Sequence, residues 1–103
     1  MNIGIKATNT TLTSSIKENV QDKLSRLEKL LKPEDRLHVE LEVNKRHQSG
    51  MLYRVEIVIQ PHGFFAEARG NDFYEALDLV VPKIKEQLAK KKDKLLTARR
   101  KGK

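Results

Sequence analysis

The middle of the chain holds three segments in which apolar and polar residues alternate, and this period of two constrains the fold more than any other feature. The segments cover residues 37–44, 53–60 and 64–69, and a shorter one covers residues 2–7. Such alternation is typical of strands with one buried face. The tripeptide PHG at residues 61–63 predicts a hairpin turn. The sequence therefore predicts four strands that share one apolar face.

Two further segments repeat apolar residues with the period of an amphipathic helix, close to 3.6 residues. The first begins after Thr13, a suitable N-cap, and Pro33 ends it. Its apolar face consists of Ile16, Val20, Leu24, Leu27 and Leu31. The second begins after Asn71 or Asp72, either of which is a suitable N-cap. Its apolar face consists of Leu77, Val80, Val81, Ile84 and Leu88.

The order of these elements, β-α-β-β-β-α, predicts a two-layer α+β fold in which both helices pack on one face of a four-stranded sheet. We expect a single domain over residues 1–96 and a flexible basic tail over residues 97–103, where no core residue remains. Pro82 lies inside the second helix, where it removes a backbone hydrogen bond. We expect a kink toward the sheet rather than a break, because the apolar period continues in register on both sides.

Charge is concentrated near the C-terminal end. The chain has 21 Lys and Arg residues against 14 Asp and Glu residues, a formal net charge of +7. Residues 83–103 hold ten basic and two acidic residues, whereas residues 1–82 hold eleven basic and twelve acidic residues. This bias predicts one surface that meets a polyanion.

The helical wheel indicates where the cations lie. Three cations of the second helix cluster opposite its apolar face: Lys83, Lys90 and Lys94. On the first helix, two cations point away from the apolar face and a third lies at its margin: Arg26, Lys29 and Lys23. If the helices lie side by side, these groups form one basic ridge. Lysines suit contacts with phosphate oxygens more than base reading, so we expect RNA binding through the backbone.

The sequence offers little for catalysis or metal binding. It has no cysteine, and its three histidines (His38, His47 and His62) lack ligand spacing. No nucleophile is paired with a base, so we expect no catalytic residue, metal, cofactor or small-molecule substrate. The N-terminus lacks an apolar signal segment, and no stretch reaches membrane-spanning length. We therefore expect a cytoplasmic protein without a membrane partner.

Several strings resemble the ribosome hibernation-promoting factors, some of which were described as sigma-54 modulation proteins. GNDFYEALD at residues 70–78 is similar to the start of a helix in that family, and KKKDK at residues 90–94 is similar to its lysine-rich end. IGI at residues 3–5 and KLSRLEK at residues 23–29 extend the resemblance, which covers residues 1–96.

The resemblance implies a fold like that of double-stranded RNA-binding domains. It implies a stress-response factor that binds the small ribosomal subunit and its rRNA near the decoding region. There the factor would block mRNA and tRNA binding and inhibit translation in starved or stationary-phase cells. Carried over by position, the residues that would meet rRNA phosphates are Lys83, Lys90, Lys91 and Lys94 on the second helix, and Lys23, Arg26 and Lys29 on the first.

Two departures from the family pattern bear on this reading. Pro82 stands where members usually carry an acidic residue, and we expect no C-terminal dimerisation domain of the kind that long members add. The short basic tail favours the short form, which promotes ribosome dimers with a separate ribosome-dimerising protein.

Two alternatives remain open. One is a general double-stranded RNA-binding or RNA-chaperone protein acting off the ribosome. The other, a protein-binding regulator of transcription, follows only from the older family description, and the basic bias weighs against it.

Overall fold

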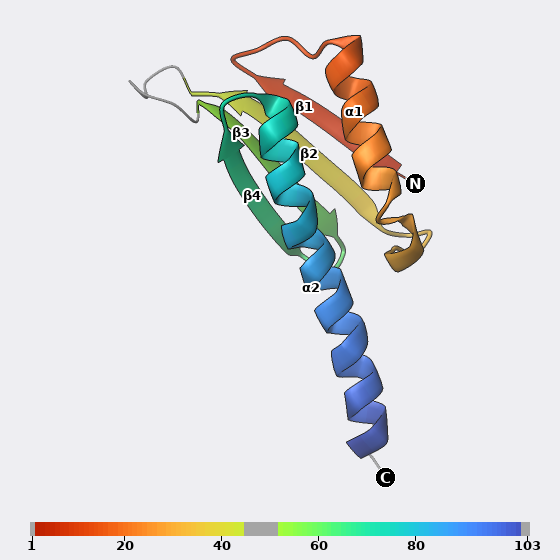
Figure 1. Ribbon diagram of the computed structural model, residues 1–103. Coiled ribbons are helices and arrows are strands. Elements are labelled where there is room, and N and C mark those ends of the chain that lie inside the picture. Colours follow the sequence, from red (N-terminus) through yellow and green to blue (C-terminus); the bar gives the residue numbers. More distant parts are fainter. Residues whose placement is uncertain (1, 45–51, 102–103) are drawn as a thin grey trace.

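The computed structural model describes residues 2–44 and 52–101, with side chains described up to Lys90. The order of the elements agrees with the predicted one (Figure 1). They are β1 (Asn2–Thr8), α1 (Ser14–Ser25), the 3₁₀ turn η1 (Glu28–Leu30), β2 (Arg36–Val43), β3 (Tyr53–Gln60), β4 (Phe64–Gly70) and α2 (Phe73–Lys101).

The four strands form one mixed sheet in the order β1-β2-β3-β4. β1 pairs in parallel with β2 through the α1 crossover, and the other two pairs are antiparallel. The register places Ile5 beside Val39, Val39 beside Ile57 and Ile57 beside Ala66. Because side chains alternate along each strand, this row lies on one face of the sheet, and the polar residues between them lie on the other.

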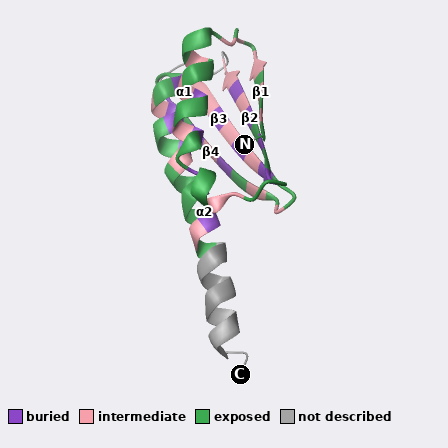
Figure 2. Cartoon of the chain, turned by 90° about the vertical axis from the view of Figure 1, so that its right-hand side faces the viewer, coloured by how far each residue is buried: buried purple, intermediate pink, exposed green. Residues whose placement is uncertain are grey.

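Both helices cover the apolar face, which confirms the predicted two-layer α+β architecture (Figure 2). The core contains Val20 and Leu24 of α1 and Leu77, Val80 and Ile84 of α2, all fully buried. α2 packs on β3 and β4, while α1 connects and covers the parallel pair β1 and β2. No helix within residues 2–44 and 52–101 covers the opposite face of the sheet, and we call it the open face.

The strand directions make the two helices run parallel. α1 returns antiparallel to β1 and β2, and α2 returns antiparallel to β4, which runs in the same direction as β2. The C-terminal ends of both helices therefore lie at the same end of the sheet, and α2 extends beyond it (Figure 1). This topology brings the basic ends of both helices to one end of the molecule.

The first helix is shorter than the sequence predicts, because it ends at Ser25 instead of continuing to Pro33. The backbone tightens into a 3₁₀ turn, in which Leu30 N donates to Leu27 O over 2.9 Å. Leu27 N donates to Leu24 O over 2.9 Å, and this i to i−3 hydrogen bond tightens the end of the helix. Lys29 consequently lies in η1 rather than in α1.

The second helix is unbroken. Asp72, rather than Asn71, provides the N-cap, because its Oδ1 accepts the backbone N–H of Glu75 over 2.7 Å. The helix continues through Pro82, as predicted, and reaches Lys101. The direction of a kink at Pro82 stays a prediction. The backbone of residues 97–101 is helical, and the flexibility expected of a tail over residues 97–103 also stays a prediction.

Candidate nucleic-acid interface

The seven predicted RNA-binding residues fall into three groups. Lys23 lies in α1, Arg26 is its C-cap residue, and Lys29 lies in η1. Lys83 and Lys90 are exposed residues of α2. Lys91 and Lys94 lie on the helical backbone of α2, but their side chains are outside the described residues. The role of all seven in RNA binding stays a prediction.

Lys23 joins the two helices. Its ammonium group forms an ion pair with Asp78 of α2, and its side chain is only 17% exposed. The Lys23 charge is therefore partly neutralised inside the interhelical contact. Asp78 closes the GNDFYEALD string, and the ion pair gives this acidic residue a structural role that the sequence alone did not indicate.

The Lys23–Asp78 pair is expected to stabilise the fold by about 1 kcal/mol, because one partner is largely shielded from water. The exposed i,i+4 pair Glu86–Lys90 provides the matched control and is expected to contribute about 0.3–0.5 kcal/mol. Double-mutant cycles with Lys23→Met and Asp78→Asn, and with Glu86→Gln and Lys90→Met, measure both in urea. If the coupling energy of Lys23–Asp78 is no larger than that of Glu86–Lys90, the interhelical ion pair does not stabilise the fold as proposed.

The Lys83 side of α2 faces the outer edge of β4. Lys83 Nζ donates to the backbone oxygen of Glu67 over 3.2 Å. One turn further on, Gln87 Nε2 donates to Phe65 O over 2.5 Å, and Gln87 Oε1 accepts the Phe65 N–H over 3.2 Å. These bonds occupy the unpaired edge of the strand, which would otherwise be open to another chain.

Lys83 and Lys90 form a row on this side of the helix. They are seven residues apart, close to two full turns, so both lie on the flank of α2 that faces β4 and points away from α1. We call them the outer row. The prediction that Lys83 lies opposite the apolar face is wrong, because its ammonium reaches the β4 edge. The cations of α1 and the outer row are therefore not joined in one ridge.

A second set of cations lies on the other flank of α2. Lys85 follows Asp78 by two turns, and since Asp78 contacts Lys23, this flank faces α1. Two exposed cations at the C-terminal end of the α1 segment, Arg26 and Lys29, lie toward the same end of the sheet. We call Arg26, Lys29 and Lys85 the inner group. In residues 2–44 and 52–90, none of the three forms an ion pair. Lys85 was absent from the predicted set, although its seven-residue spacing from Asp78 was visible in the sequence.

The open face of the sheet has a different character. Arg54 bridges three glutamates on neighbouring strands: its Nε lies 2.8 Å from a Glu67 oxygen, its NH1 lies 3.3 Å from a Glu40 oxygen, and its NH2 binds Glu56. Burial lowers the pKa of Arg54, but hydrogen bonds and charges from Glu56 and Glu67 outweigh this effect and raise the pKa above its ordinary value. Sequence reasoning missed this network.

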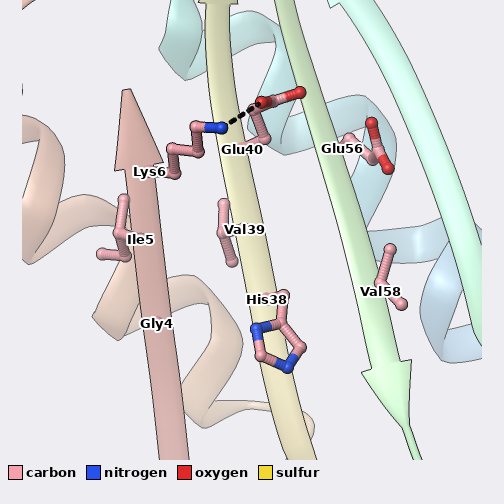
Figure 3. Close-up of a pocket in the computed structure, with 8 residues that line it drawn as sticks. All are labelled: Gly4, Ile5, Lys6, His38, Val39, Glu40, Glu56 and Val58. Carbon is pink, nitrogen blue, oxygen red and sulfur yellow. Dashed lines mark ion pairs between the residues drawn. The ribbon is translucent and has the colours of Figure 1, made fainter. Parts of the chain in front are cut away.

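A shallow hollow of about 410 Å³ lies beside the network, between β1 and β3 (Figure 3). Its polar lining includes Lys6, Glu40 and Glu56, and the Lys6 ammonium lies 4.0 Å from a Glu40 oxygen. Carboxylates in this position repel phosphate. Phe65 is an exposed aromatic of β4, but the neighbouring glutamates make this face unsuited to stacking RNA bases. The helical layer is therefore the better candidate for RNA contact.

A buried carboxylate lies at the end of the molecule that carries η1. Asp35 is 3% exposed; its Oδ2 accepts the Lys32 N–H over 2.8 Å, and its Oδ1 lies 3.1 Å from His62 Nε2. The contact holds the β3–β4 turn against the start of β2. Within the described part of the chain, no three acidic or histidine side chains gather as metal ligands, and His47 lies outside it. No helix in that part combines the length and apolar composition needed to cross a bilayer.

Comparison with known proteins identifies the family of the chain. Residues 3–96 match the family described as "Sigma 54 modulation protein / S30EA ribosomal protein". The chain belongs to this family. It is 30% identical over 97 residues to the ribosome hibernation promoting factor of Escherichia coli K12, a match that covers 92% of this chain and 97% of that protein. The factor of Acinetobacter guillouiae is 28% identical, over 87% of this chain and 86% of its own length.

Solved structures place the chain in the same family of folds. The Protein Y N-terminal domain of Thermus thermophilus superposes with a TM-score of 0.69 at 28% identity, covering 85% of this chain and 96% of that domain. A ribosomal subunit interface protein of Coxiella burnetii superposes with a TM-score of 0.72 at 24% identity, covering 90% of this chain and 99% of that protein. The S30EA fold thus accounts for the mixed sheet with both helices on one face.

Proposed function

We propose that this chain is a ribosome hibernation factor that binds the small ribosomal subunit and its rRNA near the decoding region. Bound there, it blocks mRNA and tRNA and lowers translation in stationary or starved cells. The observation that carries the proposal is the match to ribosome hibernation promoting factors over 92% of the chain. We further propose a cytoplasmic location, and a separate ribosome-dimerising protein as partner.

The charge distribution supports contact with rRNA through the helical layer. The exposed cations of the outer row and the inner group belong to α1, η1 and α2, whereas the open face holds three glutamates around Arg54. A polyanion is attracted to the first surface and repelled by the carboxylates of the second. Each phosphate neutralised by a cation releases a counterion, so binding of this kind weakens steeply as salt rises.

Inhibition by occlusion requires no chemistry. A protein that fills the path of mRNA and tRNA lowers translation by excluding them, so no catalytic residue or cofactor is part of the proposal. The fold need only be stable and its cations exposed. The likeness to double-stranded RNA-binding domains stays a prediction.

The alternative function is a general double-stranded RNA-binding or RNA-chaperone protein that acts off the ribosome. The same exposed cations would serve it, because phosphate contacts do not depend on base sequence. The two functions differ in stoichiometry. A ribosome factor has one site on each small subunit, whereas a general RNA binder occupies rRNA wherever its phosphates are accessible.

Co-sedimentation of the purified chain with small subunits, titrated in protein and repeated across salt, tests the proposal. We expect saturation near one copy per subunit, loss of binding at high salt, and competition by tRNA. Isolated large subunits are the control and should not show saturable binding of this affinity. Binding that never saturates, or that a bare RNA duplex matches in affinity, would favour the general RNA-binding alternative.

A further inference from the structure

We infer that α2 recognises an RNA duplex by straddling two phosphate backbones, with the outer row on one backbone and the inner group on the other. The inference rests on the proposed function in taking rRNA as the ligand, and it specifies the RNA structure that this helix fits. It follows from where the contacts of α2 place its cations.

The two sets of cations lie on opposite flanks of the same helix. Lys83 reaches the β4 edge, whereas Asp78 reaches α1, so the two flanks are fixed by observed contacts. From Lys83 to Lys85 the helix turns by about 200°, slightly more than half a turn. An α-helix with its side chains is about 10–12 Å wide. The side chains of Lys83 and Lys85 therefore leave opposite flanks of α2, about one helix width apart.

The outward face of α2 between these flanks is not cationic. It presents Leu79, which is 47% exposed, together with the exposed residues Pro82 and Glu86. A single RNA strand lying along this face would meet an apolar side chain and a carboxylate, and it could reach the cations of only one flank at a time. The two backbones that border the wide, shallow minor groove of A-form RNA can reach both flanks together, and the outward face then lies over base edges and 2′-hydroxyls rather than phosphates.

The cations on both flanks are available to phosphate. The Lys83 ammonium has three donors and uses one on Glu67 O. The Lys90 side chain is 70% exposed and forms an i,i+4 ion pair with Glu86. Because exposed pairs of this kind contribute little to stability, Lys90 can exchange Glu86 for a phosphate at little cost in free energy. In the inner group, Arg26, Lys29 and Lys85 are exposed.

Equilibrium binding of the full chain to an RNA duplex, and to one of its strands alone, tests this inference across a salt series. Lys83→Ala with Lys90→Ala removes the outer row, and Arg26→Ala with Lys85→Ala removes two cations of the inner group. Lys17→Ala with Arg36→Ala removes the same charge elsewhere and is the matched control. Both control residues are exposed, one near the start of α1 and one at the start of β2.

We expect the wild-type chain to bind the duplex at least about tenfold more tightly than the single strand. Each flank variant should lower duplex affinity by about tenfold and reduce the salt slope by about 2, whereas the control should leave affinity within about twofold. Equal affinity for duplex and single strand, no binding to either, or an inner-group variant with unchanged duplex affinity would overturn the inference. In each case saturable ribosome binding would leave the proposed function standing.

Discussion

Replacing Lys83 and Lys90 together by glutamate is expected to weaken binding to the small ribosomal subunit by at least about 100-fold at low salt. The substitutions remove two phosphate contacts and place two carboxylates against a polyanion. Because the effect is electrostatic, the difference between variant and wild type should shrink as salt rises. Co-sedimentation or equilibrium binding with purified subunits measures it directly.

The matched control reverses the same number of charges away from the helical flanks. Lys17→Glu with Arg36→Glu changes the net charge equally, but Lys17 lies near the start of α1 and Arg36 begins β2, whose polar side chains face the open side of the sheet. This variant should lose less than about tenfold in affinity, the part due to net charge alone. Equal losses in both variants would mean that net charge, and not the position of the outer row, governs binding. Thermal unfolding of both variants checks that the fold is intact.

Replacing Arg54 by methionine is expected to destabilise the fold by about 2–3 kcal/mol. The substitution leaves Glu40, Glu56 and Glu67 side by side on neighbouring strands without their shared cation. Removing one partner from a shielded charge network costs more than the network contributes, because the remaining charges are unpaired. The pKa of Arg54 is raised, so its guanidinium is charged at neutral pH and its contribution to stability is complete there. Urea unfolding at neutral pH measures the loss.

Salt should bring the stability of the Arg54→Met variant closer to that of the wild type. Screening weakens the mutual repulsion of the three glutamates, so the stability difference should narrow as ionic strength rises. Arg36→Met is the control, because Arg36 is exposed and forms no ion pair within the described residues. A stability difference that stays constant from low to high salt would show that lost packing, and not unpaired charge, causes the destabilisation.

The strands, the second helix and the core were predictable from the sequence. Alternation of apolar and polar residues between residues 37 and 69 predicted the ends of β2, β3 and β4 to within one residue. A strand with one buried face requires this alternation, so the sequence shows it directly. The period of α2 continued across Pro82, and the helix is indeed unbroken. The membership of the family was also predictable, since the string GNDFYEALD leads into the helix that carries the lysine-rich run.

Features that depend on tertiary contacts were not predictable. The apolar spacing of Leu27 and Leu31 suggested a continued helix, whereas α1 ends at Ser25 and the backbone tightens into the 3₁₀ turn η1. A helical wheel places lysines around one helix in isolation, so it could not show that Lys83 reaches the β4 edge. Predicting the Arg54 network would have required the register of three strands. The sequence indicated only one part of it, the pairing of Glu56 with Glu67, because the turn at residues 61–63 sets the register of that hairpin.

Cryo-electron microscopy of the chain bound to the small ribosomal subunit tests most directly the central claim that the helical layer contacts rRNA. We expect α1, η1 and α2 to face rRNA near the decoding region, with phosphates close to Lys83 and Lys90 on one flank of α2 and to Lys85 on the other. The open face of the sheet, with the glutamates around Arg54, should face away from phosphate. A complex in which the open face lies against rRNA, while the cations of α2 remain in solvent, would contradict the claim.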